Sequence, residues 1–191
     1  LFDGVESDLK ENIKFNSNKE LLIYSYRVAG TVGLMMAKIL KVQSHNSLKA
    51  AIDLGIAMQL TNIARDVIED SNRKRNYINP DFETIKETLE FADKFYESSF
   101  KSINEIPFSC RFAILVARRL YRQIGNKILD KKNMDNYKNS GKIYVSKIGK
   151  IYQTFLSIID FVKLLFMKSE EHLRKKEHDT INEEINLNDR I

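Results

Sequence analysis

Four polar side chains recur at helical spacing within one largely apolar stretch of the sequence. They are Gln59, Asn62, Asp66 and Asp70. Their separations of three, four and four residues place all of them within an arc of about 80° on one helix face, because an α-helix turns about 100° per residue. Isoleucine side chains fall on or beside that face, and a buried unpaired polar group costs about 1 to 3 kcal/mol, with more for a carboxylate. The row therefore predicts a bound ligand.

The two carboxylates of this row, Asp66 and Asp70, lie one helical turn apart. At that separation two carboxylates can share a hard divalent cation, and Asn62 adds a neutral oxygen one turn earlier. Mg²⁺ is the natural choice, with Mn²⁺ as a substitute that accepts the same oxygen ligands. The alternative is a solvated pair on an exposed face, and the spacing alone does not decide between the two.

Helical periodicity runs through most of the chain, and breakers are scarce, with 7 Gly and 2 Pro. This composition favours an all-α fold. Apolar spacing, capping residues and prolines predict helices over about 21–40, 47–72, 80–103 and 107–132, and a fifth that starts near Ser146. Residues 133–145 are predicted to form a loop.

The fifth predicted helix is strongly apolar, with residues such as Ile151 and Phe155 recurring every three or four positions. Gln153, Asp160 and Lys163 interrupt it, whereas a bilayer span needs about 20 mostly apolar residues. We therefore expect a helix of the protein core.

The chain is expected to hold one domain followed by a polar tail. Its 191 residues, 43% hydrophobic and 30% charged, are typical of a single globular domain. From residue 170 onward nearly all side chains are polar, and such a segment buries too little apolar surface to fold. We expect a helical domain over residues 1–169 and a disordered tail over residues 170–191.

Composition and charge limit the remaining classes of function. The single Cys110 excludes an internal disulfide framework, and His45, His172 and His178 show no metal-ligand spacing; both facts suit the reducing cytoplasm. The net charge of +5 fits an anionic partner without choosing among nucleic acid, phospholipid and diphosphate. The chain opens at Leu1 without a signal segment, and we expect it to be cut from a longer protein.

A basic run on the fourth predicted helix is a candidate nucleic-acid surface. It comprises Arg118, Arg119, Arg122, Lys127, Lys131 and Lys132. We interpret it as the exposed face of that helix, so no nucleic-acid partner is expected.

Two longer stretches carry a family resemblance. The stretch from Leu54 to Asp70 (LGIAMQLTNIARDVIED), followed by Arg75-Asn76-Tyr77, resembles the second aspartate-rich signature of squalene/phytoene synthases. The stretch from Tyr24 to Met35 (YSYRVAGTVGLM) resembles the other hallmark of that family, in the same order and at similar spacing. Weaker resemblance continues through residues 117–125 and 142–146, so it covers roughly residues 1–150.

The resemblance implies an all-α isoprenoid synthase helical bundle and a set of site residues. The implied metal ligands are Asp66, Asp70, Asn62 and Asp8. The implied catalytic residues are Asp66, Asp70, Tyr24 and Arg65. The implied substrate-binding residues are Gln59, Asn62, Tyr121, Lys142, Tyr77, Val28, Gly30, Val32 and Gly33. Among these, Tyr121 and Lys142 would contact diphosphate. The tunnel for prenyl chains would be lined by Tyr24, Val28, Gly30, Val32 and Gly33. Close helix packing is the alternative role of the two glycines.

The chemistry that this resemblance implies makes physical sense of these residue types. Removing diphosphate from an allylic carbon leaves a carbocation; Mg²⁺ neutralises the departing charge, and a dry cavity keeps water from the cation. An aromatic ring such as that of Tyr24 can stabilise the cation by about 1 to 2 kcal/mol.

Two departures from the family pattern bear on activity. The family's first aspartate-rich motif lies upstream of both signatures, and no residue before Leu1 supplies it, so we expect the bundle to be incomplete at its N-terminus and to lack half of its metal site. Lys142 stands where relatives carry Arg, which keeps the positive charge but loses bidentate recognition of phosphate.

The resemblance implies a transferase that condenses two geranylgeranyl diphosphates head to head, via a cyclopropyl diphosphate, to phytoene in carotenoid biosynthesis. The alternatives are a squalene or dehydrosqualene synthase acting on farnesyl diphosphate, and a non-catalytic relative acting as an assembly factor. Apolar substrates and a basic surface also predict peripheral contact with the inner face of the membrane. The substrate chain length, C20 or C15, and the oligomeric state stay open.

Overall fold

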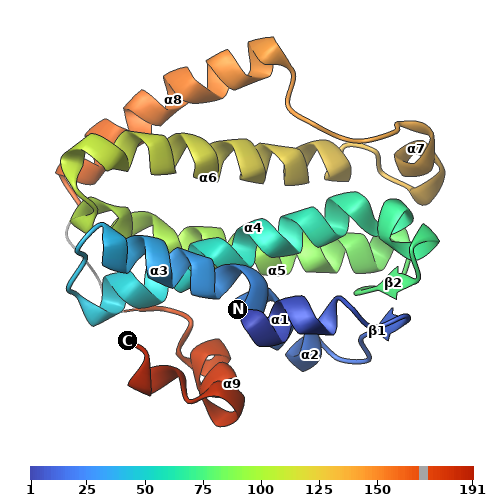
Figure 1. Cartoon of the computed structure of the whole chain (residues 1–191). Helices are drawn as coiled ribbons and strands as arrows, with labels where there is room; N and C mark the ends of the chain where they lie inside the picture. The colour runs from blue at the N-terminus through green and yellow to red at the C-terminus, as the bar shows by residue number, and fades with distance from the viewer. Residues whose placement is uncertain (168–171) are drawn as a thin grey trace.

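The computed structural model describes residues 1–167 and 172–191, which form a helical bundle with very little strand (Figure 1). The α-helices are α1 Phe2–Ser7, α2 Asn18–Ser25, α3 Thr31–Ile39, α4 His45–Asn72, α5 Phe82–Phe100, α6 Phe108–Leu129, α7 Met134–Asn139, α8 Lys147–Leu165 and α9 Lys175–Ile185. Two short strands, β1 Ile13–Lys14 and β2 Arg75–Asn76, pair in parallel. The all-α prediction is confirmed.

Helix α4 is the central element and carries the predicted polar row. Ser44 caps its N-terminus by accepting a hydrogen bond from the backbone N–H of Ser47. The helix packs against α3, α5 and α6, and the side chains of Ile52, Ile56 and Leu60 are fully buried in the core. Because α4 is 28 residues long, it spans about 42 Å and carries residues from the centre of the core to one end of the bundle.

The first predicted helix is a continuous helical segment that contains a π-helical turn in its middle. Helix α2 passes into a π-helical turn over Tyr26–Gly30 and then into α3. Gly33 lets α3 approach α4 closely, because a Cβ atom there would lie 2.1 Å from the carbonyl oxygen of Ala51. Gly55 of α4 lets the π-helical turn approach in the same way, because a Cβ atom there would lie 2.3 Å from the carbonyl oxygen of Ala29. The close-packing role of Gly33 is therefore present in the structure.

The predicted loop over 133–145 is wrong in part, because it contains α7. Asn133 caps this short helix by accepting a 2.9 Å hydrogen bond from the backbone N–H of Asn136. Tyr137 is buried against α4. One aromatic anchor and one cap stabilise a helix too short to give a periodic apolar pattern.

The prediction that the fifth helix belongs to the core is also wrong in part. Helix α8 packs on α6 and buries polar Gln153, Ser157 and Asp160, whereas Ile151 is 71% exposed and Phe155 62% exposed. The ion pair between Asp160 and Arg119 of α6 stabilises this polar inward face. The apolar face of α8 points away from the rest of the described chain.

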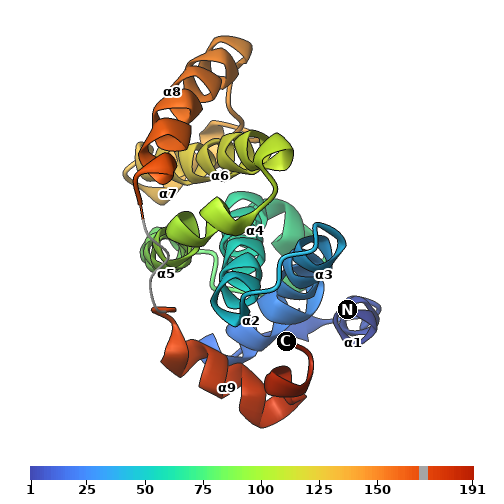
Figure 2. The ribbon, with the colours of Figure 1, turned by 90° about the vertical axis from the view of Figure 1, so that its left-hand side faces the viewer.

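The prediction of a disordered tail is wrong for residues 172–191. Helix α9 and a 3₁₀ turn over Leu187–Asp189 fold back beneath α2 (Figure 2). Ile181, Ile185 and Leu187 are buried, because their spacing places these few apolar side chains on one face of an otherwise polar segment. The expected boundary at 169/170 lies in residues 168–171, outside the described residues.

No helix in residues 1–167 or 172–191 is both long and apolar enough to cross a membrane.

Candidate functional site

The polar row of α4 begins in a cavity and continues beyond it. Gln59 and Asn62 line a cavity of about 410 Å³, and Asp66 and Asp70 follow one and two turns later on the same helix. The Oδ1 atom of Asn62 is buried without a hydrogen-bond partner among the described residues. A buried, unpaired amide oxygen beside two carboxylates is a group that a ligand could satisfy.

The cavity is largely apolar and lies between α3, α4 and α6. Of the predicted tunnel residues, Val28, Val32 and Gly33 line it, together with Tyr121 from α6. Gly30 does not: it packs against the side chains of Tyr26, Ile52 and Ile56. Tyr24 is likewise outside the cavity lining. An apolar chamber with polar groups at one end can hold a hydrocarbon chain joined to an anionic head.

The two aspartates have different electrostatic surroundings. Asp66 accepts hydrogen bonds of 2.9 Å and 2.5 Å from the guanidinium group of Arg65, and this pairing raises the pKa of Arg65. Burial raises the pKa of Asp70 to about 6, the charge of Asp66 adds to the rise, and Arg75 opposes it. The ionised form of Asp70 is therefore destabilised by its surroundings, and a divalent cation would reverse that effect.

Lys142 lies at the rim of this carboxylate cluster. Its Nζ atom is 3.2 Å from Glu69 Oε2 and 3.7 Å from Asp66 Oδ1. The side chain is mostly exposed, so it can turn toward an anion that binds at the aspartates. The predicted pair, Tyr121 and Lys142, thus approaches the row from the cavity and from solvent.

Asp8 contacts a pair of buried tyrosines. The Tyr77 hydroxyl donates to Asp8 Oδ1 at 2.8 Å, and the Tyr24 hydroxyl lies 2.9 Å and 3.0 Å from the two carboxylate oxygens. Burial raises the pKa of both tyrosines, to about 12 for Tyr77, so both stay protonated and donate. Among these described contacts Tyr24 holds Asp8 in place, and it does not line the cavity.

Tyr137 is a positioning residue that the sequence reasoning missed. Its hydroxyl lies 3.0 Å from the carbonyl oxygen of Ala64 and 2.6 Å from that of Arg65. These contacts attach α7 to α4 at the residue before Asp66. Lys142 lies shortly after α7 in the sequence, so the same contacts help to place it. The signal in the sequence was an aromatic residue within the otherwise polar run 135–141.

The first members of the basic run are turned into the bundle, so its interpretation as an exposed face is wrong for them. Arg118 is buried and donates two hydrogen bonds, of 2.9 Å and 2.7 Å, to the carbonyl oxygen of Tyr96. Arg119 pairs with Asp160. Guanidinium groups that are already paired inside the bundle form a poor surface for a phosphate backbone.

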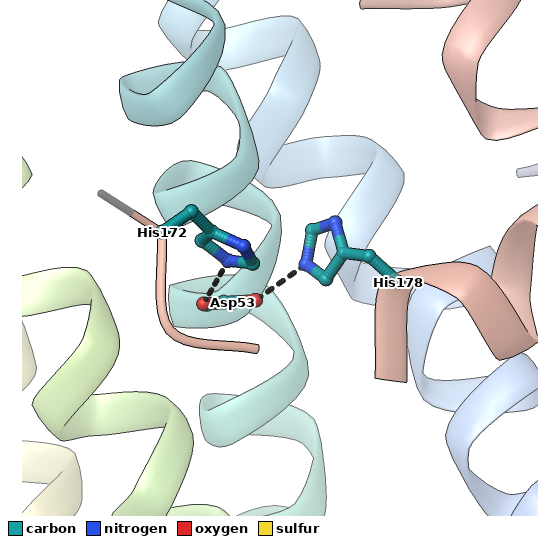
Figure 3. A group of neighbouring side chains, drawn as sticks. All are labelled: Asp53, His172 and His178. Carbon is teal, nitrogen blue, oxygen red and sulfur yellow. Dashed lines mark hydrogen bonds and ion pairs between the residues drawn. The ribbon is translucent and has the colours of Figure 1, made fainter. Parts of the chain in front are cut away.

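A second cluster of possible metal ligands lies elsewhere on α4, contrary to the expectation from histidine spacing. His172 and His178 both reach the buried carboxylate of Asp53 (Figure 3). Sequence reasoning missed it because the two segments are more than a hundred residues apart in sequence.

Comparison with known proteins identifies the family. The sequence model of the squalene/phytoene synthase family matches residues 1–82. The phytoene synthase of Pseudescherichia vulneris is 35% identical over 147 residues, covering 66% of this chain and 47% of that protein. Phytoene synthase 2, chloroplastic, of Solanum lycopersicum is 34% identical over 179 residues, covering 79% and 56%. This chain belongs to the squalene/phytoene synthase family.

A solved structure agrees with this family assignment. The crystal structure of a dehydrosqualene synthase in complex with a ligand superimposes with a TM-score of 0.66 at 26% identity, covering 85% of this chain and 64% of that one. The predicted isoprenoid synthase fold is thus confirmed. The chain spans about half the length of the curated squalene/phytoene synthase relatives that it matches.

Proposed function

We propose that the protein is a prenyltransferase that condenses two geranylgeranyl diphosphates head to head, via a cyclopropyl diphosphate, to phytoene in carotenoid biosynthesis. The observation that carries the proposal is the arrangement on α4, where an apolar cavity ends at Gln59 and Asn62 and two carboxylates follow. The similarity to relatives named phytoene synthase supports phytoene as the product.

Mg²⁺, or Mn²⁺ in its place, is the cofactor that fits these residues. The unpaired oxygen of Asn62 and the raised pKa of Asp70 are both relieved by a hard cation. Asp66, Asp70 and Asn62 would hold it, and Asp8 would contribute an oxygen whose orientation Tyr24 and Tyr77 fix. Bound there, the ion supplies positive charge for the departing diphosphate.

The chain's own residues would bind and shield the substrate. Val28, Val32 and Gly33 would contact the prenyl chain and exclude water. Tyr121 and Lys142 would contact the diphosphate, and Arg65 would keep Asp66 oriented through the observed pair of hydrogen bonds.

The similarity to a dehydrosqualene synthase structure favours one alternative reaction, the condensation of two farnesyl diphosphates to a C30 product. The cavity of about 410 Å³ does not by itself select a C20 chain over a C15 chain. The assembly-factor alternative is disfavoured by the retained row of Gln59, Asn62, Asp66 and Asp70.

We also infer a cytoplasmic protein that contacts the inner face of the membrane peripherally. The exposed apolar face of α8 supports this contact, because exposed Lys147, Lys150 and Lys163 accompany it. Such an amphipathic surface suits anionic lipid, and it would bring the cavity close to apolar substrates.

Product analysis tests the proposed reaction. The natural polypeptide that carries these 191 residues is incubated with Mg²⁺ and either geranylgeranyl or farnesyl diphosphate, beside an Asp66→Ala, Asp70→Ala variant. We expect a C40 hydrocarbon that falls by at least about 100-fold in the variant. A C30 product would instead identify a dehydrosqualene or squalene synthase. The absence of any product from either diphosphate would favour the assembly-factor alternative.

A further inference from the structure

Three side chains from distant parts of the chain meet inside the bundle. Asp53 of α4 is 0% exposed, and His172 and His178 beside it are also buried. His172 Nε2 lies 2.8 Å from Asp53 Oδ2, and His178 Nε2 lies 2.7 Å from Oδ1. Figure 3 shows both imidazole rings turned toward the one carboxylate, from the segment that leads into α9 and from α9 itself.

The geometry of the cluster suits one small ion. The two rings are 4.3 Å apart at their centroids, in an edge-to-face arrangement, and one ligand atom from each of the three residues lies within 4.8 Å of the others. Zinc bonds to nitrogen and oxygen at about 2.0 to 2.1 Å, so its tetrahedral ligands stand about 3.3 Å apart. The two Asp53–imidazole contacts, of 2.8 Å and 2.7 Å, would have to open by about 0.5 Å to reach that spacing, and ligand atoms up to 4.8 Å apart would have to draw together around the ion.

The chemistry of the ligands favours zinc over magnesium. Two imidazole nitrogens and one carboxylate form a common zinc ligand set, whereas Mg²⁺ prefers oxygen alone. The Ser98 hydroxyl donates to Asp53 Oδ2 and orients the carboxylate, as outer partners of metal ligands commonly do.

Burial gives a reason for an ion to be there. A fully buried carboxylate is costly unless it is neutralised, and an imidazole supplies positive charge only when it is protonated. Both Nδ1 atoms are buried without a partner among the described residues, so each ring's described polar contact is made through the nitrogen that faces the carboxylate. The two rings therefore present equivalent nitrogen atoms to the two oxygens of one carboxylate.

We propose that Asp53, His172 and His178 bind a zinc ion that fastens the C-terminal segment to α4. The site is separate from the aspartate row, because Asp53 precedes Asp66 by 13 residues, or about 20 Å along the helix. The proposal does not depend on the proposed reaction. Zinc would stabilise the docked position of α9 and thereby rigidify the N-terminal half of α4.

The test is zinc binding by the full chain after removal of metal with a chelator. The protein is titrated with Zn²⁺ in excess Mg²⁺, which occupies oxygen-only sites, then desalted and analysed for metal content. We expect one zinc per chain in the wild type and in a His45→Gln control, since His45 is the exposed third histidine. His172→Gln and His178→Gln should each weaken zinc binding by at least about 100-fold.

Two further readouts separate zinc binding from a folding defect. Zinc should slow trypsin cleavage in α9 of the wild type but not of the His172→Gln variant, while both keep the same helical circular dichroism. Co²⁺ in place of zinc should give the visible absorption of a tetrahedral site, absent in both histidine variants. A wild type that retains no zinc, or variants that retain as much as the wild type, would overturn the proposal. The cluster would then be a hydrogen-bonded network of Asp53, His172 and His178 without a metal ion.

Discussion

Tyr24 and Tyr77 stack with their ring centroids 4.8 Å apart, and both of their hydroxyl groups reach the carboxylate of Asp8. The three residues come from α2, from the segment after β2 and from the end of α1. The cluster therefore joins the N-terminal segments to the chain that leaves the aspartate-bearing end of α4.

Removing one hydroxyl from this cluster should lower stability. Tyr77→Phe keeps the stacked ring but removes a hydrogen bond to a carboxylate, so the free energy of unfolding should fall by about 1 to 2 kcal/mol. Urea denaturation measures the change. Tyr144→Phe is the matched control, because Tyr144 is 71% exposed and should change stability by less than about 0.5 kcal/mol. Equal effects at the two positions would contradict the described cluster.

The raised pKa of Asp70 predicts that its charge destabilises the metal-free protein. A pKa raised from 3.8 to about 6 favours the protonated form in the folded state, so the associated stability is present below pH 3.8 and is lost as pH rises through 6. A two-unit shift corresponds to about 3 kcal/mol, and partial exposure reduces the effect to about 1 kcal/mol.

Asp70→Asn should therefore raise the free energy of unfolding by about 1 kcal/mol at pH 7.5 without metal, and change it little at pH 3.5. Urea denaturation at the two pH values measures this, with Asp179→Asn on the exposed face of α9 as the control. A destabilised Asp70→Asn variant at pH 7.5 would contradict the assigned surroundings of Asp70.

Gly33 should be intolerant of a single methyl group. Gly33→Ala places a Cβ atom 2.1 Å from the carbonyl oxygen of Ala51, so α3 and α4 must separate at a cost of about 1 to 3 kcal/mol. Gly125→Ala in α6 meets only the end of the Leu89 side chain at 3.2 Å and gains helix propensity, so it should be neutral or stabilising. Thermal unfolding of both variants measures the difference, and similar melting temperatures would contradict the close contact.

The exposed face of α8 should bind anionic vesicles. Replacing Ile151 and Phe155 by Asp removes two large apolar groups, each worth about 1.5 to 3 kcal/mol when buried, so vesicle binding should weaken by at least about 10-fold. Sedimentation with vesicles containing phosphatidylglycerol measures it. Ile39→Asp on α3 is the control, since Ile39 is as exposed as Ile151, at 71%. An undiminished double variant would show that α8 does not contact lipid.

Local patterns in the sequence predicted the elements that carry long apolar repeats. Helix α4 was predicted over 47–72 and runs over His45–Asn72, and α6 was predicted over 107–132 and runs over Phe108–Leu129. The row from Gln59 to Asp70 could be placed on one face because helix periodicity alone determines it.

The features that the sequence did not predict depend on contacts between distant segments. Helix α9 is stabilised by Ile181 and by the pairing of His178 with Asp53, and neither partner is recognisable from the polar tail alone. Helix α8 was predicted to belong to the core, but its apolar residues face outward while Asp160 pairs with Arg119. Tyr137 likewise depends on a partner in α4 that is 73 positions away in the sequence. Asp8 depends on Tyr24, 16 positions away, and on Tyr77, 69 positions away.

The most direct test of the central claim is calorimetric titration of the protein with a non-hydrolysable geranylgeranyl thiodiphosphate, with and without Mg²⁺. The account predicts binding that requires Mg²⁺ and that an Asp66→Asn, Asp70→Asn variant loses by at least about 100-fold, while the variant keeps its fold by circular dichroism. Binding that is equal with and without Mg²⁺, or unchanged in the folded variant, would contradict the assignment of Asp66 and Asp70 to the diphosphate site.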